Sequence, residues 1–322
     1  MPGLTQSNVN SYRHQGYLVL REGLKPEDLL PLRALITTLT DEHAQKLHRA
    51  GKISSLYETE SFERRLAVIN EEVKFRSRLE DLTQRFNSPE LFNLIRHPAI
   101  LDSVSSLLGP EVAWTGSFVT RPKLPQNASA TFPWHQDSQY YGGPTQHLHV
   151  VSVWIPLVDV DEYNGCLYVL PGSHTWGLLK GKRGEDNLMI TSEDVEKRAK
   201  PTALPMSQGD ILFFSNLTFH SSKPNSTDKV RWSVDLRYVV PPLAATPTEQ
   251  QQQGYDTLDT HYGVAPITVR SRRTENVASL AQLQDFASRY SAQKATPRKS
   301  ANLQLGQVNR TSKSFDMIGP RK

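Results

Sequence analysis

The sequence predicts a mostly β fold, a sandwich or barrel with N-terminal helices wrapped around it. From about residue 112 to residue 240, short runs of β-branched and aromatic residues alternate with clusters of turn-forming residues. Before residue 110, apolar residues recur at helical spacing instead. The 322 residues are 37% hydrophobic and 22% charged, which is enough apolar content to fill a core.

The first 110 residues are expected to be helical apart from one short strand at Tyr17–Leu20. The segment Lys25-Pro26-Glu27-Asp28 has proline in a first helical turn and acidic residues near the positive end of the helix dipole, which predicts a helix start. Helix-compatible patterns continue through the polar stretch 43–80. A further apolar helical pattern covers residues 92–108 and is closed by Gly109-Pro110.

Five strands are expected in the next part of the chain. They are Val112–Thr120, Val150–Val158, Leu167–Leu170, Asp210–Ser215 and Val230–Val240. The charged, glycine-containing stretch Leu178–Leu204 is long for a loop within a compact domain, so we expect an excursion or lid there. The run Gln250–Gln253 is interpreted as a short polar spacer.

These patterns indicate a single domain over residues 1–290, made of a helical part (1–110), a β core (111–242) and a C-terminal extension (243–290). Residues 291–322 contain seven lysines and arginines against one aspartate, a charge of +6 in a chain whose net charge is +4. Residues 1–290 therefore have a net charge of −2. The tail is polar and predicted to be disordered, and the body offers no basic groove, so we expect no nucleic-acid partner.

No apolar run approaches the ~20 residues that a membrane-spanning helix needs. The first ten residues show no secretory signal. Cys166 is the single cysteine, so an intramolecular disulfide and a cysteine zinc site are excluded. We therefore predict a cytoplasmic protein without a membrane partner, which binds a small molecule. Monomer and homodimer both remain open.

One set of residues has the chemistry of a non-haem iron site. His135 and Asp137 are two residues apart, a spacing that on a strand points both side chains to one face. His220 follows a buried-looking strand downstream, and Arg231 lies eleven residues beyond it. Two imidazoles and a carboxylate suit Fe(II) because they leave open positions for a 2-oxo acid and O₂. Arginine supplies the planar charge that a remote carboxylate of such an acid needs.

Two other groups of residues are weaker candidates for a metal site or a substrate site. His147 and His149 form a second pair at the same spacing, which a cupin-like metal site could use, although no glutamate is placed to complete it. Gln139, Tyr140 and Tyr141 follow the first pair, where a substrate would arrive. They either bind the substrate or pack within the fold.

The sequence resembles the phytanoyl-CoA dioxygenase family of Fe(II)/2-oxoglutarate oxygenases over residues ~10–240, with a looser match at Val269–Arg272. The matching segments are Gly16–Leu20, His97–Pro110, Trp134–Asp137, Asn164–Leu167 with Leu170–His174, Gly209-Asp210, and His220 through Ser233.

The resemblance implies a double-stranded β-helix core, also called a jelly-roll or cupin-like core. It also implies roles for six residues: His135, Asp137 and His220 as iron ligands, and Arg231, Ser222 and Trp154 as residues of the 2-oxoglutarate pocket, with Arg231 and Ser222 on its far carboxylate. Related halogenases replace the carboxylate ligand by a small residue. Asp137 is present here, so the resemblance favours hydroxylation over halogenation.

We therefore expect an Fe(II)/2-oxoglutarate-dependent dioxygenase that oxidises a C–H bond of a small-molecule metabolite, with hydroxylation as the favoured outcome. Its co-substrates are 2-oxoglutarate, converted to succinate and CO₂, and O₂. Desaturation or ring formation on the same fold, a non-catalytic jelly-roll binding protein, and an oxygenase directed to nucleic acid by the tail are the alternatives. Substrate identity depends on the loops at residues 43–80, 139–148 and 178–204.

Overall fold

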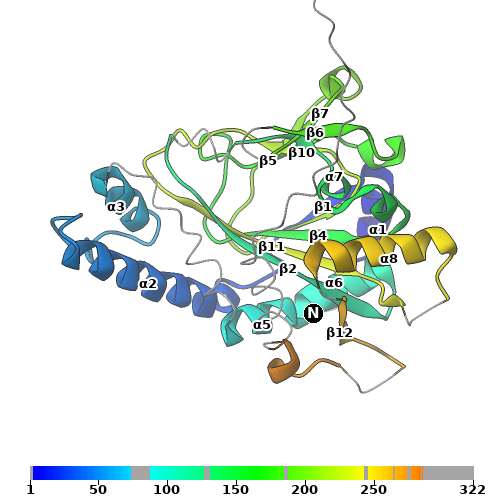
Figure 1. The fold of residues 1–322 in the computed structure, drawn as a ribbon, viewed down its shortest axis with the longest axis horizontal. Helices are drawn as coiled ribbons and strands as arrows, with labels where there is room; N and C mark the ends of the chain where they lie inside the picture. The colour runs from blue at the N-terminus through cyan, green and yellow to red at the C-terminus, as the bar shows by residue number, and fades with distance from the viewer. Residues whose placement is uncertain are drawn as a thin grey trace, which may run out of the picture.

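Antiparallel strands form two main sheets in the computed structural model, which describes residues 3–73, 88–126, 131–184, 188–242, 246–263, 265–273, 277–283 and 285 (Figure 1). The larger sheet has the order β1-β9-β4-β11-β2-β12, and the smaller sheet has the order β3-β10-β5-β8. Together they make the predicted jelly-roll core. The basic tail at residues 291–322 lies outside the described residues, so its disorder stays a prediction.

The strands of the larger sheet are β1 (Tyr17–Leu20), β2 (Val112–Lys123), β4 (Val151–Pro156), β9 (Ile211–Ser215), β11 (Arg231–Val239) and β12 (Ile267–Arg270). Those of the smaller sheet are β3 (Phe132–His135), β5 (Leu167–Val169), β8 (Thr202–Leu204) and β10 (His220–Ser222). The five strands expected from the sequence are β2, β4, β5, β9 and β11, each confirmed to within a few residues.

The helices are α1 (Gln6–Gln15), α2 (Pro26–Arg49), α3 (Arg65–Val73), α5 (Pro89–Ile95), α6 (Pro98–Leu108), α7 (Asp137–Tyr141) and α8 (Glu249–Tyr262), with short 3₁₀ turns η3 (Gly143–His147), η4 (Ser173–Trp176) and η5 (Val195–Lys197). The start of α2 is confirmed: Pro26 occupies its first turn, and the carboxylate of Asp28 accepts from the Lys25 amide at 2.8 Å. Among the described residues no helix is long and apolar enough to cross a bilayer.

Every residue of β11 is buried, but its two faces differ. The outward face is apolar: Trp232 contacts the ring of Phe62, and the Tyr238 hydroxyl donates to the Ile95 carbonyl at 2.7 Å. The face turned into the jelly roll is polar, because every second residue carries a charge or a hydroxyl. These residues are Arg231, Ser233, Asp235 and Arg237. This inner face supplies much of the site described below.

The interpretation of Gln250–Gln253 as a spacer is wrong, because these residues lie inside α8. Thr248 begins the helix with a reciprocal capping box in which its hydroxyl accepts from the Gln251 amide at 3.2 Å. The helix holds its place through the buried side chains of Tyr255, Leu258 and Tyr262, and it packs against η3 and β2. The glutamines obscured this helical spacing.

The excursion expected at Leu178–Leu204 contains a hairpin of β6 (Gly181–Arg183) and β7 (Met189–Thr191), the turn η5, and β8. β8 pairs with β5 and so belongs to the smaller sheet. The hairpin forms a separate two-stranded sheet at one end of the jelly roll, and β7 lies next to β3 (Figure 1).

Both edges of the larger sheet come from outside the stretch expected to form the β core. β1 pairs with β9, where Tyr17 faces Phe214. At the other edge, β12 pairs with β2, where Ile267 faces Trp114. The sheet thus joins strands from the two ends of the described chain.

Candidate metal centre and co-substrate pocket

His135, Asp137 and His220 meet inside one end of the jelly roll. His135 ends β3 directly opposite His220, the first residue of β10, and the two imidazole centroids are 4.1 Å apart. One oxygen of Asp137, Oδ1, lies 3.7 Å from Nε2 of His220. The three side chains are buried, and their ligand atoms all lie within 4.8 Å of one another. A single metal ion can therefore reach all three.

The backbone at this motif differs from the expected one. β3 ends at His135, and Asp137 is the first residue of α7 rather than a strand residue. Gln136 caps the helix, since its amide donates to the Gln139 side chain at 3.0 Å, and its own side chain donates to the carbonyls of Gly177 and Leu217. The prediction that both residues lie on one strand is wrong, although their side chains still converge.

Both imidazoles are oriented by backbone carbonyls. Nδ1 of His135 donates to Pro133 at 2.7 Å, and Nδ1 of His220 donates to Thr218 at 3.0 Å. Nε2 of each ring is left with its lone pair for a metal. Burial and, to a smaller extent, the nearby His220 lower the pKa of His135 to about 3. Burial also lowers the pKa of His220. Both ligands are therefore neutral, the metal-binding form, at physiological pH.

Asp137 is supported by two residues that the sequence analysis missed. Oδ2 accepts from the Ser152 hydroxyl at 2.5 Å and from Nε of Arg237 at 2.9 Å. Burial alone would raise the pKa of Asp137, but the Arg237 guanidinium and the two imidazoles outweigh it and hold the pKa below its usual value. The signal in the sequence was the alternation of polar residues from Arg231 to Arg237 within an apolar strand.

Arg231, Ser222 and Trp154 are brought together by a fourth residue, Lys123. Arg231 on β11 and Lys123 on β2 are directly paired, and both side chains are buried. Nζ of Lys123 donates to Oγ of Ser222 at 2.8 Å and also to the Lys223 carbonyl. The Arg231 guanidinium lies over the Trp154 ring at 5.3 Å. Lys123 was not predicted as a site residue, because the strand expected from the sequence ended at Thr120, whereas β2 continues to Lys123.

This second cluster has an excess of positive charge. Nη1 of Arg231 donates to Ser233 at 2.6 Å, while Nε is buried without a hydrogen-bond partner among the described residues. Burial and the neighbouring Arg231 lower the pKa of Lys123 to about 7. The nearby carboxylate of Asp235 is engaged by Arg121. Because buried charges require partners, the cluster fits an anion such as the far carboxylate of 2-oxoglutarate.

Of the three residues expected near the substrate, Tyr140 lies against a metal ligand. Its ring meets that of His135 edge-on at 5.1 Å, and its hydroxyl accepts from the Met189 amide at 2.8 Å. The Tyr141 hydroxyl instead accepts from Arg237 at 2.9 Å. Gln139 donates to the Leu179 carbonyl at 3.0 Å and so ties α7 to the excursion.

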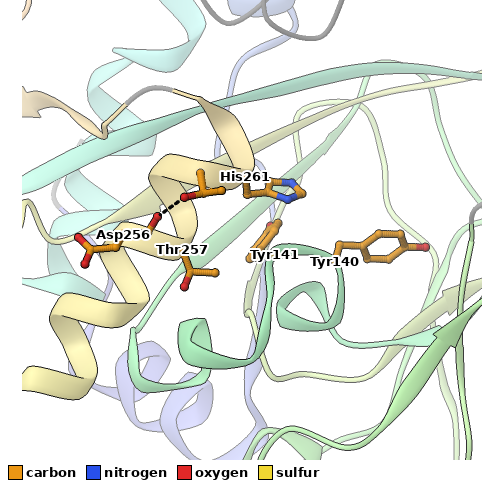
Figure 2. Close-up of a pocket in the computed structure, with 6 residues that line it drawn as sticks. Tyr140, Tyr141, Asp256, Thr257 and His261 are labelled. Atoms are coloured by element: carbon orange, nitrogen blue, oxygen red, sulfur yellow. Dashed lines mark hydrogen bonds between the residues drawn. The ribbon is translucent and has the colours of Figure 1, made fainter. Parts of the chain in front are cut away.

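A pocket of about 440 Å³ lies between α7 and α8 (Figure 2). It is lined by Tyr140, Tyr141, Asp256, Thr257, Thr260 and His261. Figure 2 shows Tyr141 beside His261, with ring centroids 5.3 Å apart, and Tyr140 directed away from the helix. The four residues from α8 were missed because that helix was not predicted.

The alternative pair does not assemble a comparable site. His147 ends η3, and Nε2 of His149 is hydrogen-bonded to the Tyr12 hydroxyl at 2.9 Å. Within the described ranges, His135, Asp137 and His220 form the one group of three potential metal ligands.

Two imidazoles and one carboxylate inside a jelly roll, beside a buried arginine, define the class of non-haem iron oxygenases that use a 2-oxo acid. Residues 12–233 match the family model described as phytanoyl-CoA dioxygenase (PhyH). The chain belongs to this family. It is accordingly an oxidoreductase whose cofactors are Fe(II) and 2-oxoglutarate.

Individual proteins agree with the assignment. The peroxisomal phytanoyl-CoA dioxygenase of Mus musculus is 26% identical over 242 residues, which cover 73% of this chain and 68% of the mouse protein. Matches to the mammalian and nematode phytanoyl-CoA dioxygenases span between 46% and 68% of the relative's own length. Activity and substrates of those whole proteins therefore carry over to this chain only as proposals.

Two solved structures share the fold. The non-haem monooxygenase ThoJ, in its apo form, aligns with a TM-score of 0.55 and 22% identity over 89% of this chain and 95% of its own. EctD from S. alaskensis, solved with 2-oxoglutarate and 5-hydroxyectoine, aligns with a TM-score of 0.52 and 17% identity over 74% of this chain and 77% of its own.

Proposed function

We propose that the protein hydroxylates a C–H bond of a small molecule and converts 2-oxoglutarate to succinate and CO₂ in the same reaction. The observation that carries the proposal is the pairing of two complementary clusters. The triad of His135, Asp137 and His220 fits a metal ion, and the buried cations Arg231 and Lys123 form no ion pair within the part of the chain that the structure describes.

The protein's own residues divide the work of binding and orientation. The triad would hold Fe(II), and Arg231, Lys123 and Ser222 would hold the far carboxylate of 2-oxoglutarate through charge-assisted hydrogen bonds. Fe(II) and 2-oxoglutarate, when bound, supply the chemistry that transfers one oxygen atom of O₂ to a C–H bond. Tyr140, whose ring lies against His135, would help to orient the substrate.

The β6–β7 hairpin would cover the site as a lid. Thr191 on β7 donates to the Trp134 carbonyl at 2.9 Å, next to a metal ligand, and the Met189 amide donates to Tyr140. The hairpin is therefore attached to the segment that carries the ligands. Such a cover would exclude water during turnover. Limited proteolysis should cut the hairpin less readily when Fe(II), 2-oxoglutarate and substrate are bound, and equal cutting would remove the lid.

The test of the function has two stages. Anaerobic protein loaded with Fe(II) and 2-oxoglutarate is screened against a metabolite library for shifts of its visible absorption band, which substrate binding perturbs. Hits are then turned over under ¹⁸O₂. Hydroxylation places one labelled oxygen in the product and the other in succinate. A product without label shows desaturation or ring formation, and absence of succinate shows a non-catalytic binding protein.

We also propose a small-molecule partner and a cytoplasmic location, with no nucleic-acid or membrane partner and a monomeric or homodimeric state. The mammalian relatives are named as peroxisomal proteins, so fluorescence microscopy of the tagged full chain must decide between the two compartments. Binding to DNA that falls steeply with salt would contradict the small-molecule proposal.

A further inference from the structure

Arg237 is buried directly behind the candidate metal ligand Asp137. Its side chain lies on the inner face of β11, and the residue is 7% exposed. Nε donates both to Asp137 Oδ2 and to the Tyr141 hydroxyl, each at 2.9 Å, and Nη1 donates to the Leu236 carbonyl at 3.1 Å. These contacts fix the plane of the guanidinium.

The two oxygens of Asp137 are consequently unequal. Oδ2 accepts two short hydrogen bonds, from Ser152 at 2.5 Å and from Arg237 at 2.9 Å. Among the described residues, Oδ1 accepts one long hydrogen bond, from Nη2 of Arg237 at 3.5 Å, and it is the oxygen that lies 3.7 Å from Nε2 of His220. The carboxylate therefore presents Oδ1 to the metal position and keeps Oδ2 turned away.

Arg237 is also packed against the residue that backs the second imidazole. Its guanidinium lies 5.8 Å from the centroid of the Phe214 ring, and that ring lies 4.6 Å from the ring of His220. Arg237 thus contacts Asp137 directly and lies near His220 through the Phe214 ring. A change in the position of the guanidinium should therefore affect the metal site more than the surrounding fold.

We propose that Arg237 is a positioning residue that makes Asp137 a one-oxygen metal ligand and so preserves an open coordination position. This inference rests on the proposed iron and 2-oxoglutarate chemistry, which needs three open positions. When the guanidinium fork is lost, Oδ2 keeps only the hydrogen bond from Ser152 and can turn toward the metal more readily. A two-oxygen carboxylate would then occupy a position that the co-substrate requires.

The experiment uses Co(II), whose visible spectrum reports coordination number, as the probe in the full-length protein. Arg237→Lys keeps the charge and removes the fork. We expect it to weaken Co(II) binding about tenfold to a hundredfold, the range typical for residues that orient metal ligands. The Co(II) spectrum should change, and 2-oxoglutarate should bind the Co(II)-loaded variant at least several-fold more weakly.

Arg65→Lys is the matched control. Arg65 is also 7% exposed and also pairs with an aspartate, Asp41, but it joins α3 to α2 far from α7 (Figure 1). This variant should lower the melting temperature and leave Co(II) and 2-oxoglutarate binding within about twofold of the wild type. If Arg237→Lys behaves in the same way, Arg237 only holds the fold and the proposal is overturned.

Milder variants keep the proposal testable if Arg237→Lys does not fold. Ser152→Ala and Tyr141→Phe each remove one hydrogen bond from the same network, and both should weaken Co(II) binding and alter its spectrum by less than Arg237→Lys does. Wild-type spectra and affinities in both would overturn the role of Arg237. If the wild-type protein itself fails to bind Co(II), the proposed iron site falls and this inference falls with it.

Discussion

The two ends of the inner face of β11 differ in how their buried charges are paired. At the Arg237 end, the guanidinium meets the carboxylate of Asp137, so each buried charge has a partner of opposite sign. At the Arg231 end, the guanidinium contacts the Ser233 hydroxyl and the Trp154 ring, and the ammonium of Lys123 donates to hydroxyl and carbonyl oxygens. Among the described residues neither cation has an ion pair, and the Arg231 Nε has no hydrogen-bond partner.

The fold itself neutralises the buried charge at the Arg237 end, whereas the charge at the Arg231 end needs a bound ligand. A balanced buried pair can persist without help, whereas two buried cations keep part of their desolvation cost until an anion arrives. A 2-oxo dicarboxylic acid would bind the metal at one end and cancel the excess charge at the other. The co-substrate should therefore stabilise the protein as well as take part in turnover.

The largest effect should come from the balanced end. Changing His135 to Ala removes a metal ligand and should abolish 2-oxoglutarate turnover and bound Fe(II), as should Ala at Asp137 or His220. Metal content by elemental analysis and succinate formation provide the measurement. His147→Ala is the control and should retain both. Wild-type activity in His135→Ala together with loss in His147→Ala would move the site to the second histidine pair.

Arg231→Ala tests the unbalanced end and should come next in size. Charged hydrogen bonds contribute roughly 1.5–3 kcal/mol each, and about 1.4 kcal/mol is a factor of ten. The KM for 2-oxoglutarate should rise at least a hundredfold, and Arg231→Lys should recover part of this because an ammonium lacks the planar fork. Fe(II) binding should survive. A lower melting temperature with an unchanged KM would instead make Arg231 a structural residue.

Lys123 should make the binding of 2-oxoglutarate depend on pH. Its pKa of about 7 means that the free protein loses this charge as pH rises. A bound carboxylate would raise that pKa, so binding takes up a proton, and the KM for 2-oxoglutarate should rise about tenfold between pH 6 and pH 8.5. Lys123→Met should weaken binding about tenfold at pH 6 and flatten the profile. An unchanged profile in this variant would exclude Lys123 from the pocket.

The same pKa makes a prediction about stability without ligand. The folded pKa of Lys123 lies below the value of 10.5 for an exposed lysine, so the unfolded chain binds more protons between about pH 7 and pH 10. The contribution of Lys123 to the free energy of unfolding should therefore increase with pH across that window. Chemical denaturation of wild type and Lys123→Met at both ends of the window measures the difference.

The smallest effect is expected at Ser222, which already accepts a hydrogen bond from Lys123. Its hydroxyl proton remains available for the far carboxylate of 2-oxoglutarate. Ser222→Ala should raise the KM about tenfold or less, with metal content and melting temperature unchanged. A hundredfold rise would mean that the serine, rather than the arginine, dominates recognition at this end.

The features predicted correctly from the sequence are those that depend on residues close together along the chain. The strands from Val112 to Val240 and the start of α2 follow from local periodicity and capping. The triad follows from a two-residue spacing and a histidine after a Gly-Asp turn. One local feature was predicted wrongly. The two-residue spacing of His135 and Asp137 suggested a strand and did not show that Gln136 caps a helix.

The features that were missed depend on strand register and on tertiary packing. Lys123 acquires a role only because β2 places it opposite Arg231. Ser152 and Arg237 are likewise paired across β4 and β11, and together they hold a carboxylate from α7. No spacing along the chain encodes these neighbours. The α7–α8 pocket was missed for a different reason, because α8 itself was not predicted.

The two edges of the larger sheet also determine when the protein can finish folding. On the ribosome, Tyr17–Leu20 emerges long before its partner Ile211–Ser215 has been made, and its backbone must wait unpaired. The opposite edge closes only when Ile267–Arg270 has followed. Incomplete chains therefore expose unpaired strand segments through most of their synthesis, a condition that favours aggregation until residue 270 has been made.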